Sequence, residues 1–125
     1  MIRTNKKVTA IDAVTATTTS GAINVQGARA LGFLFKRANH SAGSTAFTVE
    51  GTIDGGSNWF ALNVILKNVT NTNAQTLTRV ASVSLASNTA EYCSINLQDF
   101  PLEQIRVTAT ETTDGTHTAL VYVKY

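Results

Sequence analysis

Apolar and polar side chains alternate along several segments of this sequence. The alternation is clearest in residues 45–53, where Phe47, Val49 and Ile53 are expected to point inward, and it returns in residues 104–111. Because successive side chains of a β-strand point to opposite faces, this period of two predicts strands with one face in a core. Helical signals are poor, since threonine and valine abound and no apolar pattern with a period near 3.6 is sustained.

Turn residues separate further segments of the same kind. The expected strands span residues 7–17, 22–25, 30–37, 45–53, 59–62 with 64–69 as an extension, 77–85, 91–97, 104–111 and 117–125. Asp114-Gly115 is a strong signal for a hairpin before the last of them. About eight short strands at a spacing of roughly 8–12 residues predict an all-β, single-domain antiparallel β-sandwich, jelly-roll-like, with a small barrel as the alternative.

Length and composition fit one domain with a polar but weakly charged surface. The chain has 125 residues and no long linker rich in proline, glycine and serine. We expect a flexible basic arm at residues 1–7 and the sandwich at residues 8–125. Charged residues make up only 14% of the chain, so hydroxyl and amide side chains must keep the surface wet. Such a surface suits packing against other proteins, because hydroxyls cost less to desolvate than ions.

Basic residues are too scattered in the sequence to predict a nucleic-acid partner. The net charge is +2, and the only dense cluster is Arg3, Lys6 and Lys7, with Lys36-Arg37 as a second pair. We interpret the first group as a solvated tail and the second as a strand end, and we take Arg3, Lys6 and Lys7 as candidate partner-binding residues. No apolar run approaches the ~20 residues of a membrane span, so no membrane partner is expected.

Residues that could carry chemistry are few. Cys93 shares a strand face with Ile95 and Leu97, which favours a small buried residue over a nucleophile. His40 and His117 fit no metal-ligand spacing. The carboxylates are expected at turns or on outward strand positions, where they are solvated, and no nucleophile elbow is present. The sequence therefore predicts no enzyme activity, no metal and no cofactor.

Residues 52–59 form the most specific local string. They resemble an Asp box, the structural hairpin of sialidases and other β-propellers, although Asn58 replaces the usual threonine. The carboxylate can accept hydrogen bonds from turn amides, the glycines allow positive φ, and the tryptophan can pack under the turn. We expect a structural hairpin built by Asp54, Gly55, Gly56 and Trp59.

Four aromatic residues offer a second hypothesis. Trp59, Tyr92, Tyr122 and Tyr125 could form a platform for sugar rings, which would make the chain a carbohydrate-binding β-sandwich module. The competing explanation is core packing. A third hypothesis, a small enzyme that acts on glycans, would require two carboxylates about 5–10 Å apart in a cleft.

Two parts of the chain carry a family resemblance. The string from Phe47 to Trp59, within residues 45–62, and the strands at 105–110 and 118–121, within residues 103–125, resemble small β-sandwich virion proteins of tailed bacteriophages. The resemblance implies a non-enzymatic virion structural protein, of the capsid decoration (cement) type, assembled in the host cytoplasm. Its implied partners are the major capsid or other virion subunits and further copies of itself. The choice between head and tail stays open.

Overall fold

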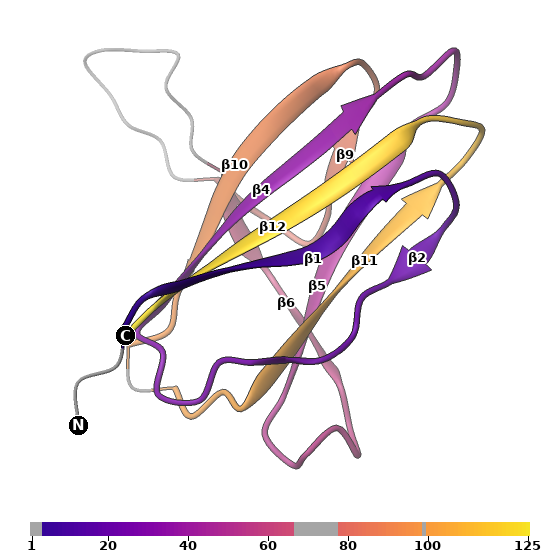
Figure 1. Ribbon diagram of the computed structural model, residues 1–125. Helices are drawn as coiled ribbons and strands as arrows, with labels where there is room; N and C mark the ends of the chain where they lie inside the picture. Colours follow the sequence, from indigo (N-terminus) through magenta and orange to yellow (C-terminus); the bar gives the residue numbers. More distant parts are fainter. Residues whose placement is uncertain (1–3, 67–77, 99) are drawn as a thin grey trace, which may run out of the picture.

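The computed structural model describes residues 4–66, 78–98 and 100–125, and two antiparallel sheets pack face to face within them (Figure 1). The strands are β1 (Lys6–Val14), β2 (Thr18–Thr19), β3 (Ile23–Asn24), β4 (Ala30–Ala38), β5 (Thr45–Thr52), β6 (Phe60–Leu62), β7 (Val64–Leu66), β8 (Thr78–Val80), β9 (Val83–Leu85), β10 (Thr89–Asn96), β11 (Gln104–Glu111) and β12 (Thr116–Lys124). The predicted all-β sandwich is confirmed. The described residues form twelve strands rather than about eight, because six of them span only two or three residues.

Each sheet has a long central part and short edges. Sheet A has the order β1-β12-β4-β10-β7-β8. Sheet B has the order β2-β11-β5-β6, with β3 also paired to β11 and β9 to β5. Hydrogen-bonded neighbours are therefore often far apart in sequence, as when β12 inserts between β1 and β4. This topology decides which side chains share an outer face.

Aromatic rings join the two sheets at the centre of the core. Phe33 and Phe35 point inward from β4, and Phe47 points inward from β5. The rings of Phe35 and Phe47 stack with their centroids 4.6 Å apart. Burying one such side chain stabilises the fold by roughly 1.5–3 kcal/mol, so these contacts between the sheets dominate over any single turn.

The inward position expected for Ile53 is wrong. Its side chain is 51% exposed, because β5 ends one residue earlier, at Thr52. The Thr52 hydroxyl is turned into the hairpin, where it donates to Asp54 Oδ1 at 2.7 Å and accepts from the Gly56 amide at 3.1 Å. This local hydrogen bonding stops the alternation before it reaches Ile53.

The single strand expected at residues 77–85 is also divided. Its described part contributes β8 to sheet A and β9 to sheet B, so the chain crosses from one layer to the other around Ala81 and Ser82. Residue 77 and the expected extension at 67–69 lie outside the described residues.

The first strand begins earlier and ends earlier than expected. Lys6 and Lys7 pair with Val123 and Tyr122 of β12, so they belong to sheet A rather than to a free arm. The register shifts twice between Thr9 and Val14, which brings Ile11 to the core side. Residues 1–3 of the expected arm, and with them Arg3, lie outside the described residues.

Candidate interaction surfaces

The hairpin between β5 and β6 is organised by one carboxylate. Asp54 Oδ1 accepts from the Asn58 amide at 3.0 Å as well as from Thr52, and Asp54 Oδ2 accepts from Asn58 Nδ2 at 2.8 Å. The hydrogen bonds from Asn58, followed by that from Thr52, lower the pKa of Asp54 to about 2. Both oxygens of the Asp54 carboxylate therefore accept hydrogen bonds from the hairpin itself. The carboxylate thus stabilises the turn and is not a free acid group.

Trp59 closes this hairpin on the outer side of sheet B. Gly55 and Gly56 have φ values of 72° and 94°, in the region that favours glycine. A Cβ atom on Gly56 would lie 3.5 Å from the Trp59 ring, so the ring packs against the turn. The guanidinium carbon of Arg106 lies 4.2 Å from the centroid of the same ring, and its Nε donates to Glu50 at 2.9 Å. Trp59 is therefore engaged by its own chain.

A polar cluster is buried at the opposite end of the sandwich. Arg37 lies at a strand end, as predicted for the Lys36-Arg37 pair, and its side chain is fully buried. Its guanidinium donates to four main-chain carbonyl oxygens, at 2.7–3.3 Å, and lies 3.3 Å from Glu111 Oε1. These acceptors belong to Ala42, Gly43, Leu85 and Asp114. The cluster ties together loops that are distant in sequence.

Glu111 and His117 complete the cluster. Glu111 Oε2 accepts from the buried Thr45 hydroxyl at 2.7 Å and lies 3.6 Å from His117 Nδ1. Burial raises the pKa of Glu111, but the hydrogen bonds from Thr45 and the Thr113 amide, with the charge of Arg37, outweigh it and hold this pKa below its ordinary value. The His117 ring nitrogens make no hydrogen bond within the described residues. Structural contacts therefore occupy the Glu111 carboxylate.

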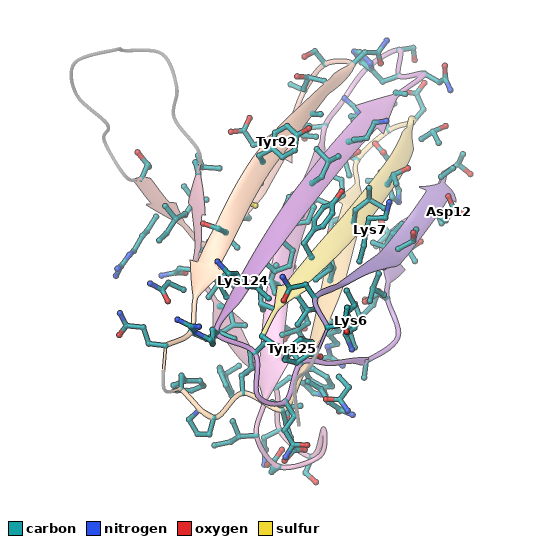
Figure 2. All side chains as sticks on the ribbon, turned by 60° about the vertical axis from the view of Figure 1, so that its left-hand side comes forward. Lys6, Lys7, Asp12, Tyr92, Lys124 and Tyr125 are labelled. Atoms are coloured by element: carbon teal, nitrogen blue, oxygen red, sulfur yellow. The ribbon has the colours of Figure 1, made fainter. Side chains whose placement is uncertain are left out.

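The predicted aromatic platform is divided between the two sides of the molecule. Tyr92 and Tyr122 are 58% and 43% exposed on the outer face of sheet A, whereas Trp59 lies on sheet B. Tyr125 packs partly against the core. Only the two tyrosines of sheet A are thus available together, and Figure 2 shows Tyr92 on β10.

The outer face of sheet A is basic and partly apolar. Its register aligns one row of outward residues across six strands, and a second row beside it across four. The first row is Lys7, Tyr122, Gly32, Ser94, Ile65 and Arg79, and the second is Thr9, Leu120, Leu34 and Tyr92. Neither row contains a carboxylate. Asp12 lies further along the edge strand β1, beyond the first register shift, as Figure 2 shows.

The outer face of sheet B is covered by hydroxyl groups instead. Thr19, Thr108 and Thr48 lie side by side on β2, β11 and β5, and the Thr19 and Thr108 hydroxyls are 3.0 Å apart. The charged residues next to them, Arg106 and Glu50, are paired with each other. We call Thr19, Thr48, Thr108 and Thr110 with Ala46 the threonine face.

Other candidate chemistry is sparse in the described part of the chain. Cys93 is buried as expected, and burial, with the charge of Glu91, raises the pKa of its thiol to about 12. Residues 4–66, 78–98 and 100–125 contain no group of three or more His, Cys, Asp or Glu side chains that could hold a metal ion. Nor do they contain a helix long and apolar enough to cross a membrane.

Comparison with solved structures finds the same fold in the SPBc2 prophage-derived protein YomS. The two structures superpose with a TM-score of 0.59 and 18% sequence identity, over 98% of this chain and 97% of that chain. At this identity the likeness shows the fold alone, but it does so over nearly the full length of both proteins. No protein-family model matches the sequence, and a search of curated proteins finds no relative.

Proposed function

We propose that the chain is a non-enzymatic structural protein of a bacteriophage particle, and that it acts as a capsid decoration subunit through protein–protein contacts. The observation that carries the proposal is the full-length fold likeness to a protein whose name marks it as prophage-derived. It agrees with the resemblance of residues 45–62 and 103–125 to small virion proteins. In the described residues, the carboxylates of Asp54 and Glu111 are occupied by structural hydrogen bonds.

The threonine face is the surface best suited to contact with other virion subunits. Hydroxyl groups lose less on desolvation than ions do, and each can donate or accept a hydrogen bond. The ion pair of Arg106 with Glu50 would enter such an interface already neutralised. A standard interface takes about 800 Å² from each partner, and the molecule exposes 7269 Å², so one contact uses a small part of its surface.

An add-back experiment tests this function. Particles grown without the gene are mixed with purified protein and separated by sedimentation. The wild-type chain is expected to sediment with the particles, and a Thr48→Lys, Thr108→Lys variant is expected to stay in solution. Thr9→Lys adds a charge to an exposed position of sheet A and is the matched control. Wild-type protein that never sediments with the particles would contradict the proposal.

The exposure of Tyr92 and Tyr122 favours a second candidate, a carbohydrate-binding module. Exposed aromatic rings on a flat sheet can stack against sugar rings. This candidate predicts saturable binding of neutral oligosaccharides that is lost in Tyr92→Ala and in Tyr122→Ala. Isothermal titration calorimetry measures this binding directly. Heats of injection equal to the heats of dilution would contradict the candidate function.

A further inference from the structure

Three hollows adjoin one another along the outer face of sheet A. The first, of about 490 Å³, is bordered by Lys7 and Tyr122, and it shares Lys124 with the second, of about 440 Å³. The second shares Asn96 with the third, of about 230 Å³. We call these three adjoining hollows together the basic groove, and its key residues are Lys6, Lys7, Arg29, Arg79, Tyr122 and Lys124.

The described residues of the groove carry charge of one sign. Among residues 4–66, 78–98 and 100–125, no aspartate or glutamate side chain lines any of the three hollows, whereas five of the key residues are lysine or arginine. Elsewhere in the described chain, Arg37 and Arg106 are neutralised by Glu111 and Glu50. A second copy packed on this face through the same groove would set these cations against each other. A negatively charged occupant would instead pair with these cations, so charge complementarity favours it.

Tyr122 adds an open aromatic surface to the groove. Its neighbour on β4 is Gly32, where a Cβ atom would lie 3.6 Å from the Tyr122 Cβ. Glycine therefore leaves space beside the exposed ring. Aromatic rings combined with a basic track characterise surfaces that bind single-stranded nucleic acid, because every base offers a face for stacking and every nucleotide a phosphate.

We propose that the basic groove binds single-stranded nucleic acid. Phosphates lie against Lys7, Arg29, Arg79 and Lys124, and a base stacks on Tyr122. Figure 2 shows Lys6, Lys7 and Lys124 near the same end of the sheet. No nucleic-acid partner is expected from the sequence, because these cations are scattered along the chain. Folding gathers them from four separate segments onto one face.

The dimensions of the groove also favour a single strand. The row from Lys7 to Arg79 crosses five strand spacings, or ~24 Å in a sheet. Domains that bind single strands cover about 4–16 nucleotides, and the groove fits the lower end of that range. The groove is about two side-chain rows wide, because Lys124 and Asn96 lie in the row next to Tyr122 and Ser94, and this is still narrow for the roughly 800 Å² of a standard protein interface. A duplex would present only phosphates and would leave Tyr122 without a role.

Fluorescence anisotropy of a labelled oligo-dT of 12 nucleotides tests the proposal with the purified full chain. Saturable binding is expected at low salt, with a slope of log K against log salt of about −0.7 for each phosphate contact. Tyr122→Ala should weaken binding about fivefold or more. Lys124→Gln should reduce the slope by about 0.7. The controls are Tyr92→Ala and Lys36→Gln, which change the same face outside the hollows and should bind like wild type.

Four results would overturn the proposal. The first is no binding of oligo-dT at low salt. The second is an equal loss with Lys36→Gln and Lys124→Gln, which would indicate general attraction to a positive surface. The third is binding of poly-L-glutamate as tightly as oligo-dT with no effect of Tyr122→Ala, which would indicate an acidic protein partner. The fourth is a neutral oligosaccharide that displaces oligo-dT.

Discussion

The guanidinium of Arg37 lies 3.3 Å from the carboxylate of Glu111 inside the sandwich, where the two side chains are 0% and 5% exposed. Arg37 comes from the end of β4, and Glu111 comes from the end of β11 in the other sheet. The pair therefore links the two layers at one end of the molecule. The same guanidinium also donates to the carbonyls of surrounding loops, so one buried side chain joins several segments at that end.

Glu111→Gln should strongly destabilise the fold. It keeps the shape of the side chain but leaves the Arg37 charge buried without its counter-ion, which costs about 3–5 kcal/mol. Urea unfolding measures the loss. Glu50→Gln is the matched control, since the ion pair of Glu50 with Arg106 is about one-third exposed on each side. Its loss should be under about 1 kcal/mol. Equal losses in the two variants would contradict the buried role of Glu111.

Stability should decline in acid because Glu111, Asp54 and Asp114 have lowered pKa values in the folded chain. A carboxyl of this kind stabilises the fold fully above its unfolded pKa, and the contribution is lost as pH falls through the folded pKa. For Asp54 and Asp114 the pKa is lowered from 3.8 to about 2, so their contributions disappear between those values. For Asp114 the cause is hydrogen bonding from Ser41 and Ala42.

Urea midpoints at pH 7, 4, 3 and 2 check this decline. Wild type should lose stability steadily below about pH 4.5, the ordinary pKa of a glutamate. The urea midpoint of Asp114→Asn should be lower than that of wild type at pH 7, and it should fall less steeply as the pH decreases. The reason is that the variant takes up one fewer proton on unfolding. Curves that run parallel for the two proteins would show that Asp114 contributes nothing to the acid response.

Phe47→Ala should cost about 3–5 kcal/mol, because it removes a ring that joins the two sheets and leaves a cavity. The Phe47 side chain is 1% exposed. Ile53→Ala is the control, and it should change stability by less than about 0.5 kcal/mol, because half of that side chain is in water. Thermal unfolding distinguishes the two variants, and a melting temperature of Phe47→Ala equal to that of wild type would contradict its place in the core.

Alternation along the chain is enough to predict the layers of the fold. Phe47 and Val49 are buried where the pattern puts them, and Cys93 and Ile95 are buried on the inner side of β10. Ile53 does not follow the alternation, because side-chain hydrogen bonds of Thr52 end the strand. Such local hydrogen bonding is hard to predict from residue types alone.

The alternation also predicts the burial of one charged residue, Arg37. Arg37 follows Leu31, Phe33 and Phe35 at intervals of two, on the inward side of β4. Its charge suggests solvent, but the alternation predicts burial, and the alternation is correct. Its partner Glu111 could not be predicted, because the two positions meet only once the loops at that end are placed.

The outer surfaces were the least predictable part. Lys7, Arg79 and Lys124 come from β1, β8 and β12, and they share a face only because of the strand order in sheet A. That order depends on long-range pairing, which a single sequence does not reveal. The exposure of Tyr122 is also hard to predict, because both faces of β12 carry large side chains.

Gly56→Ala should destabilise the hairpin between β5 and β6. Gly56 has a φ of 94°, where a residue with a Cβ is strained by about 1–2 kcal/mol. Gly21→Ala is the matched control, because a Cβ there meets nothing within 4 Å and its φ is outside the left-handed region. That variant should be neutral or slightly stabilising. Chemical unfolding compares the two, and equal effects would contradict the turn geometry.

We propose that this chain is a structural subunit of a phage particle. Quantitative mass spectrometry of gradient-purified particles, from the phage whose genome encodes the chain, tests this proposal. We predict that the chain sediments with the particles in a fixed ratio to their major capsid subunit, preparation after preparation. A chain that is abundant in the lysate but missing from the purified particles would contradict the proposal.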